Sequence, residues 1–316
     1  MLEPATLLPD IEGDVAFVTG AASGIGLAVS KALVNRGESV IMLDINEEGC
    51  KKAATELNEK AGKKVAIAVK ADTTCFKDQL AAYELGKEAF GRVDYCNAIL
   101  LYALSNFTCI FVVFANAGIA EHPWLPPFDP STASSRAIIE PDTKTLDVSL
   151  NGQLNTAALA FQVFERQKPN PRTGFRGKLV MTASVYGYWS CKSMPMYAAA
   201  KAGVVNFVRG LARYYGDKGV TVNMVGLVFD DVGGLVTPIA PPDFVELLGE
   251  HMFSSVDFVA EKMISVLGSS KDNGRAISIV RREVWDHPEP SLMYEQNKPG
   301  MDFVEDEVGR RMGLWK

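Results

Sequence analysis

The sequence predicts an α/β fold, a single domain built on a doubly wound parallel sheet with helices on both faces. Two observations predict it. A glycine-rich turn near the start joins an apolar strand-like segment to a helix-like one, and strand-like and helix-like segments then alternate along the chain. Apolar strands that alternate with helices pair in parallel and are covered by helices on both sides.

In the first half, each predicted helix is followed by a glycine (Gly37, Gly62 or Gly91), the residue that favours a helix end. The strands of this half are predicted at Val15–Thr19, Ser39–Leu43 and Val65–Val69, and the helices at Gly24–Arg36, Glu47–Ala61 and Phe76–Phe90.

The second half continues the same alternation. Its strands are predicted at Phe111–Ala115, Lys178–Thr182, Val220–Val225 and Ala276–Val280, and its helices at Thr143–Gln167, Met196–Tyr215, Pro241–His251 and Val256–Leu267. No repeat or second core is apparent. We therefore predict an extension at residues 1–11, one domain at 12–285 and a polar tail at 286–316.

Composition narrows the class of protein. The 316 residues are 47% hydrophobic and 22% charged, which is typical of a globular chain. A net charge of −6 argues against a nucleic-acid partner. Five scattered cysteines without a Cys-x-x-Cys pair, and three distant histidines, indicate neither a disulfide framework nor a metal site. The start has no basic or apolar leader pattern, so a cytoplasmic location is expected.

The turn after the first strand is a candidate phosphate site. A strand that turns into a helix through glycines presents backbone N–H groups at the helix N-terminus, where phosphates bind. Gly20 would permit the tight turn, and Gly24 and Gly26 would let a pyrophosphate approach. The candidate cofactor-binding residues of this turn are Gly20, Ser23, Gly24, Ile25 and Gly26.

Asp44 ends the second predicted strand, eighteen positions after Gly26. A carboxylate there can accept hydrogen bonds from ribose hydroxyls and would repel a 2′-phosphate. No basic residue follows at Ile45 or Asn46, so the sequence favours NAD over NADP, with NADP as the alternative. The competing interpretation makes Asp44 a surface cap of the next helix.

Tyr197 and Lys201 share one face of a predicted helix, because positions i and i+4 are neighbours. A cation near a phenol lowers its pKa from about 10, which would help the phenol act as a general base toward an alcohol. Ser184 lies thirteen positions upstream, at a strand end. These three residues are expected at the same sheet edge as the glycine turn.

These motifs identify a resemblance. The glycine turn, Asp72, Asn116-Ala117-Gly118 and Ser184 with Tyr197-x-x-x-Lys201 match the short-chain dehydrogenase/reductase family in order and spacing over roughly residues 12 to 280. The chain looks similar to NAD-dependent hydroxysteroid and hydroxyprostaglandin dehydrogenases and to fungal secondary-metabolite members. The resemblance implies a Rossmann fold, a nicotinamide cofactor and a homo-oligomer, either a dimer or a tetramer, assembled through the two long helices.

The resemblance also implies residue roles. Tyr197 would exchange a proton with the substrate oxygen, which Ser184 would hold. Lys201 would bind the nicotinamide ribose and lower the pKa of Tyr197. Asp72 would contact the adenine, and Asn116 would brace the central strand beside the cofactor.

Three departures from the family pattern bear on activity. Ser149 occupies the position of the family's fourth catalytic residue, an Asn, and Asn151 lies about 200° further around the helix. We therefore count Ser149, which could hold a water near Lys201, among the candidate catalytic residues. The loop at 226–236 is also altered, which leaves Thr237 as the candidate contact of the nicotinamide carboxamide. Beside these three departures, the last strand lacks the family's Gly-Gly.

The other departure is an apolar insertion at 95–110, within a stretch from Tyr95 to Ala120 that has no charged residue. That stretch is long enough for a transmembrane helix, but such a helix would cut through the middle of the sheet. An apolar loop facing lipid or a partner is a second interpretation. We favour a third, a gene-model artefact such as a translated intron, because an exposed apolar loop invites aggregation.

The sequence thus predicts an oxidoreductase that interconverts a secondary alcohol and a ketone. The segments 122–135 and 238–253 are apolar and would wall a hydrophobic polyketide-, terpenoid- or steroid-like substrate, in secondary-metabolite biosynthesis. The alternative is a catalytically impaired dinucleotide-binding protein with a scaffold or regulatory role.

Overall fold

The computed structural model describes residues 13–90, 110–133, 135–170, 173–227, 255–267, 273–280, 283–289 and 298–313. The chain forms two compact units, Met1–Asp286 and His287–Lys316. Each unit is described by itself.

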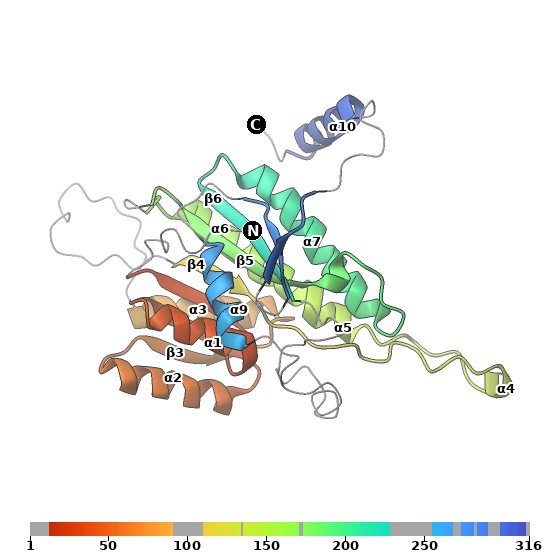
Figure 1. Ribbon diagram of the computed structural model, residues 1–316, viewed down its shortest axis with the longest axis horizontal. Coiled ribbons are helices and arrows are strands. Elements are labelled where there is room, and N and C mark those ends of the chain that lie inside the picture. Colours follow the sequence, from red (N-terminus) through yellow and green to blue (C-terminus); the bar gives the residue numbers. More distant parts are fainter. Residues whose placement is uncertain are drawn as a thin grey trace. The chain divides into compact units, whose positions relative to one another are not determined.

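The first unit contains an eight-stranded sheet in the order β3-β2-β1-β4-β5-β6-β7-β8 (Figure 1). The strands are β1 Val15–Thr19, β2 Ser39–Asp44, β3 Ala66–Lys70, β4 Ile110–Ala115, β5 Gly177–Ser184, β6 Val220–Leu227, β7 Ala276–Val280 and β8 Glu283–Asp286. The first seven pair in parallel. The strand order reverses direction between β1 and β4, and ligands of such sheets bind at that point, beyond the carboxyl ends of the strands.

Helices cover both faces of the sheet, as the sequence predicted. One apolar core lies between the sheet and α1 (Gly24–Val34), α2 (Glu47–Ala61) and α9 (Val256–Ser265). The other lies under α3 (Phe76–Phe90), α6 (Gly152–Arg166) and α7 (Pro195–Tyr215). The predicted doubly wound α/β fold is therefore confirmed.

One strand departs from the predicted parallel sheet. β8 pairs with β7 antiparallel at the sheet edge, and the register joins Ile277 to Asp286 and Val280 to Glu283. Its four residues are mostly exposed and include Trp285, so they lack the apolar run that predicts a buried parallel strand. Antiparallel edge strands on otherwise parallel sheets are common.

The predicted helix Thr143–Gln167 is present but not uniform. It consists of α5 (Lys144–Leu146), the π-helical turn η1 (Asp147–Asn151) and α6. Single π turns within α-helices occur frequently at functional sites. Ser149 lies in the middle of this turn and is fully buried.

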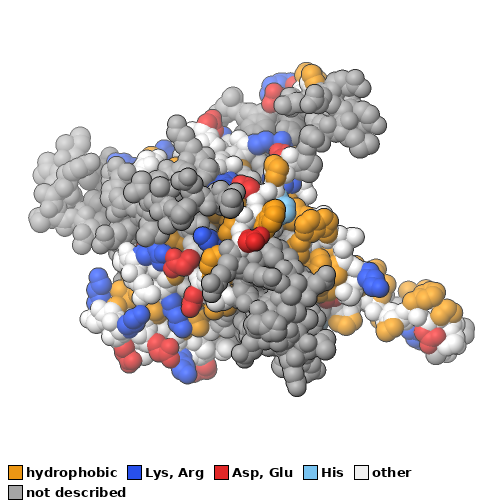
Figure 2. Space-filling model, in the orientation of Figure 1, with side chains coloured by type: hydrophobic (Ala, Val, Ile, Leu, Met, Phe, Trp, Pro, Cys, Tyr) orange, Lys and Arg blue, Asp and Glu red, His pale blue; other side chains and the backbone are white. Residues whose placement is uncertain are grey.

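An arm of residues 123–142 leaves the sheet after β4 and includes the short helix α4 (Pro130–Ala133) (Figure 1). Its large apolar side chains are exposed, with Phe128 at 94% and Ile138 at 103% of full exposure. Figure 2 shows hydrophobic side chains gathered along this arm.

The second unit contains α10 (Lys298–Arg311), where the sequence predicted only a polar tail. Glu307 on this helix pairs with Arg310 and Arg311, three and four residues later. Among the residues that the structure describes, no helix combines the length and apolar character needed to cross a membrane. The predicted helix Pro241–His251, residue Thr237 and all of the 95–110 insertion except Ile110 lie outside the described residues.

Candidate active site

The glycine turn between β1 and α1 agrees with the prediction of a tight turn at Gly20, but Gly26 has a packing role where an approach for pyrophosphate was predicted. Gly20 and Gly24 have φ angles of +68° and +52°, which glycine adopts without a steric penalty. A Cβ on Gly26 would lie only 2.1 Å from the carbonyl oxygen of Gly20. The absence of a side chain at Gly26 therefore lets the first turn of α1 pack directly on the end of β1.

The N-terminus of α1 fits an anionic group. Ser23 is the N-cap residue, but its side chain makes no capping hydrogen bond, and the first turn carries no acidic residue. Ile25 is buried in the core under the turn and anchors it. A helix start with uncapped N–H groups and a glycine turn beside it suits the pyrophosphate of a dinucleotide.

Asp44 lies beside this turn. Its Oδ2 accepts a hydrogen bond of 2.9 Å from the backbone N–H of Ala22, and its Oδ1 accepts one of 2.8 Å from Asn46. The side chain of Asn46, not that of Asp44, caps α2 by accepting from Gly49. The alternative role of Asp44 as the cap of α2 is therefore wrong.

Asp72 follows β3 at the same sheet edge. Its Oδ1 accepts hydrogen bonds from the backbone N–H of Thr74 at 2.9 Å and from the Thr74 hydroxyl at 2.8 Å. The carboxylate thereby fixes the turn that leads into α3. No hydrogen bond between Asp72 and the glycine turn appears among the described residues.

Asn116 joins three strand ends. Its Nδ2 donates to the carbonyl oxygen of Thr19 at 3.1 Å, and its backbone N–H donates to the Thr19 hydroxyl at 3.0 Å. Its Oδ1 accepts from the Thr182 hydroxyl at 3.0 Å. The amide therefore holds the carboxyl ends of β1, β4 and β5 together beside the glycine turn.

Ser184, Tyr197 and Lys201 meet at this edge. A side-chain hydrogen bond joins Ser184, at the end of β5, to Tyr197 in the first turn of α7. The Lys201 Nζ lies 5.5 Å from the centre of the Tyr197 ring. It also donates to the carbonyl oxygen of Thr182 at 2.9 Å. The structure thus brings the three predicted residues together.

The pKa of Tyr197 differs from the sequence expectation. Burial raises it to about 12, because the hydrogen bond from Ser184, which lowers it, does not offset the loss of solvent, and the nearby Tyr186 raises it further. Burial also lowers the pKa of Lys201 to about 7. The prediction of a Tyr197 pKa below its usual value is therefore wrong, since burial of the phenol outweighs the lowering effect of its hydrogen bond.

Ser149 also lies at the site. Its hydroxyl donates to the carbonyl oxygen of Ile119 at 2.9 Å and accepts from the Ile119 N–H at 3.0 Å. A Cβ on Gly118 would lie 3.5 Å from both the Ser149 Oγ and the Lys201 Nζ. Because the hydroxyl proton of Ser149 already bonds Ile119, the residue fixes the backbone between β4 and the arm.

Two further polar residues at the site carry no recognisable sequence signal. Gln153 donates to the carbonyl oxygen of Thr182 at 3.0 Å, so that this oxygen accepts from both Gln153 and Lys201. Glu121 accepts hydrogen bonds from the backbone of Tyr197 and its neighbour Met196. Both contacts join segments distant in sequence, which residue spacing does not reveal.

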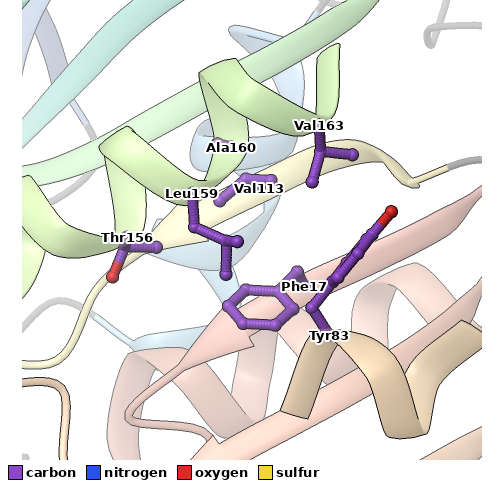
Figure 3. Close-up of a pocket in the computed structure, with 7 residues that line it drawn as sticks. All are labelled: Phe17, Tyr83, Val113, Thr156, Leu159, Ala160 and Val163. Carbon is purple, nitrogen blue, oxygen red and sulfur yellow. The ribbon is translucent and has the colours of Figure 1, made fainter. Parts of the chain in front are cut away.

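A small crevice occurs elsewhere, between α3, α6 and the sheet. Figure 3 shows the side chains that line it, which are almost all apolar. They are Phe17, Tyr83, Val113, Thr156, Leu159, Ala160 and Val163. None of the predicted site residues contributes to it, so we do not connect it with the chemistry at the sheet edge.

The fold and the site define a class of protein, the dinucleotide-binding oxidoreductases. The model of the short chain dehydrogenase family matches residues 14–231. The chain therefore belongs to that family, whose members are NAD(P)-dependent oxidoreductases acting on CH–OH groups.

Curated relatives agree with this assignment, and a solved structure shares the fold. A cyclohexanol dehydrogenase of Acinetobacter sp. (strain SE19) is 31% identical over 211 residues, 67% of this chain and 70% of the relative. The short-chain dehydrogenase/reductase prx7 of Penicillium rubens is 29% identical over 263 residues, 80% of each chain. The crystal structure of a 3-ketoacyl-(acyl-carrier-protein) reductase from Brucella melitensis complexed with NADH shares the fold, with a TM-score of 0.65, 21% identity and coverage of 87% of this chain and 100% of that chain.

Proposed function

We propose that this chain interconverts a secondary alcohol and a ketone by hydride transfer with NAD(H). The observation that carries the proposal is the hydrogen bond between Ser184 and Tyr197 beside Lys201, at the sheet edge that also holds the glycine turn. A hydroxyl donor and a proton-transferring phenol next to a dinucleotide site are the groups that this reaction requires.

Each residue then has a defined task. In ketone reduction, Ser184 donates a hydrogen bond to the carbonyl oxygen. Tyr197, whose pKa of about 12 keeps it protonated near neutral pH, transfers its proton to that oxygen. A nicotinamide cofactor held at this sheet edge would be the hydride donor in reduction and the hydride acceptor in oxidation. In oxidation Tyr197 would act in its phenolate form, so that the alcohol O–H bond breaks as the Tyr197 O–H bond forms.

The remaining candidates would hold the cofactor. We propose that Lys201 binds the nicotinamide ribose, that Asp72 contacts the adenine and that Thr237 contacts the carboxamide. Asp44 would accept hydrogen bonds from the adenosine ribose and disfavour NADP. The 2.9 Å hydrogen bond from Ala22 supports this assignment, since it locates the carboxylate at the glycine turn.

The substrate is proposed to be hydrophobic and cyclic, of the polyketide, terpenoid or steroid type. The arm supports this choice with exposed Trp124, Leu125 and Phe128 close in sequence to the site. The relative named cyclohexanol dehydrogenase points the same way. We further propose a place in secondary-metabolite biosynthesis and a homo-oligomer assembled through α6 and α7.

The test is cofactor absorbance with a panel of secondary alcohols and cyclic ketones, in both directions. Tyr197→Phe should abolish turnover and leave the NADH dissociation constant unchanged. Tyr214→Phe removes the same hydroxyl at the other end of α7 and serves as the matched control. Turnover that survives Tyr197→Phe would refute the mechanism. NADH binding by the parent chain without turnover of any panel compound would favour a scaffold role.

A further inference from the structure

The helix that carries Tyr197 begins without a local cap. Its N-cap residue, Met194, offers no side-chain acceptor, and Pro195 has no N–H at the first position. The first hydrogen bond along the helix runs from Ala198 to the carbonyl oxygen of Met194 at 2.9 Å. The N–H groups of Met196 and Tyr197, the pair that an N-cap side chain would bond, therefore need an acceptor from elsewhere.

Glu121 provides that acceptor from the segment after β4. Its Oε2 accepts from the Tyr197 N–H at 2.7 Å, and its Oε1 accepts from the Met196 N–H at 3.2 Å. Both carboxylate oxygens are used, and the negative charge lies at the positive end of the helix, where charge-assisted bonds are strongest. One remote side chain thus caps the first turn of α7.

The backbone around Glu121 is itself fixed. Ile119 is bonded through both its N–H and its carbonyl group to Ser149. The N–H of His122 donates to the Thr145 hydroxyl at 2.8 Å. Glu121 therefore reaches α7 from a segment held on both sides by the α5–η1 region, which gives its carboxylate a defined position.

We propose that Glu121 is a positioning residue that sets the Tyr197 hydroxyl against Ser184 by holding the first turn of α7. Tyr197 is the third residue of that helix, so fraying of the turn would displace its ring directly. The inference rests on the proposed function, because it concerns the same proton transfer.

The first test is Glu121→Ala. We expect kcat to fall by about tenfold or more, since small displacements of a reacting group cost that much. The KM for the cofactor and the NADH dissociation constant should stay within about twofold, because the glycine turn is untouched. Glu56→Ala removes the same side chain from the exposed face of α2 and should change neither quantity. Equal losses of kcat and NADH affinity would indicate a merely structural role and overturn the proposal.

A second variant restores the cap locally. Met194→Asp, introduced into Glu121→Ala, places a carboxylate at the N-cap, where it can accept from Met196 or Tyr197. We expect this double variant to recover most of the lost kcat. The proposal attributes the loss of kcat to the missing cap of α7, whichever residue provides that cap. A double variant with a kcat as low as that of Glu121→Ala alone would therefore contradict it.

Amide hydrogen exchange separates this inference from the proposed function. In Glu121→Ala the peptide containing Met196 and Tyr197 should exchange faster by about tenfold or more, while Glu56→Ala leaves it unchanged. If the parent chain turns over no substrate, the proposed function fails, and the exchange result alone decides whether Glu121 holds the turn. Unchanged exchange in Glu121→Ala would overturn the inference whatever the activity.

Discussion

Replacement of Gly26 by alanine tests whether the glycine turn binds the cofactor. The new Cβ would lie 2.1 Å from the Gly20 carbonyl oxygen, 2.7 Å from the Gly20 carbonyl carbon and 2.9 Å from the Asn116 Nδ2. Two of these atoms belong to the backbone, and the third belongs to the Asn116 side chain, whose amide makes two hydrogen bonds to neighbouring strands. None can rotate away easily.

The required displacement sets the magnitude. A carbon and a carbonyl oxygen in ordinary contact are about 3.3 Å apart, so the start of α1 must move away from β1 by about 1.2 Å. Overpacking of this kind costs about 1–3 kcal/mol and would lower Tm by several degrees in a domain of this size. Because the displaced atoms carry the N–H groups proposed to bind the pyrophosphate, we expect the NADH dissociation constant to rise by about tenfold or more, equivalent to about 1.4 kcal/mol.

The assay is NADH fluorescence titration with thermal denaturation on the same samples. Gly210→Ala is the matched control, because a Cβ at Gly210 meets nothing within 4 Å. That change should leave NADH binding unaltered and stabilise α7 by up to about 1 kcal/mol through helix propensity. Parent-like NADH affinity in Gly26→Ala would refute the assignment of the glycine turn to the cofactor.

Three further predictions follow from the site. Asp44→Asn should lower the ratio of the NADP to the NAD dissociation constant by about tenfold or more, since it removes the charge expected to repel a 2′-phosphate. An unchanged ratio would contradict this. Lys201→Met should remove a pH dependence of stability. Burial lowers the pKa of Lys201 from 10.5 to about 7. Between pH 7 and 10.5 the unfolded chain therefore holds a proton that the folded chain lacks, so the free energy of unfolding of the parent should rise with pH. Urea titrations at several pH values would contradict this if the free energy of unfolding changed with pH equally in parent and variant. Ser149→Ala should lower the free energy of unfolding by about 1–3 kcal/mol, because it leaves both backbone groups of Ile119 without their partner, and a urea midpoint equal to that of the parent would exclude this role.

The sequence predicted well those parts of the fold that local chemistry determines. β1, α2 and α3 begin and end as predicted, because apolar runs, acidic first turns and glycines act at the positions where they occur. The turn at Gly20 was predictable for the same reason, since its positive φ is a local requirement. Family spacing located Ser184, Tyr197 and Lys201 at one edge.

Elements that depend on distant partners were not predicted. β8 is a strand only because β7 offers an edge, and its residues show no buried pattern. The π turn around Ser149 places its hydroxyl on Ile119, thirty residues earlier in the chain. The contact from Glu121 to α7 spans more than seventy residues. No local signal encodes such pairings.

The pKa of Tyr197 shows the same limit in the chemistry. From spacing alone, the Lys201 ammonium is the natural influence on the phenol, and it lowers the pKa. In the folded chain the two groups are enclosed together, and burial acts on both, raising one pKa to about 12 and lowering the other to about 7. The two pKa shifts have one cause, the exclusion of water from the region between the end of β5 and the start of α7. Residue spacing shows that the two groups are neighbours, but it does not show how deeply the fold buries them, and that burial sets the direction of both pKa shifts.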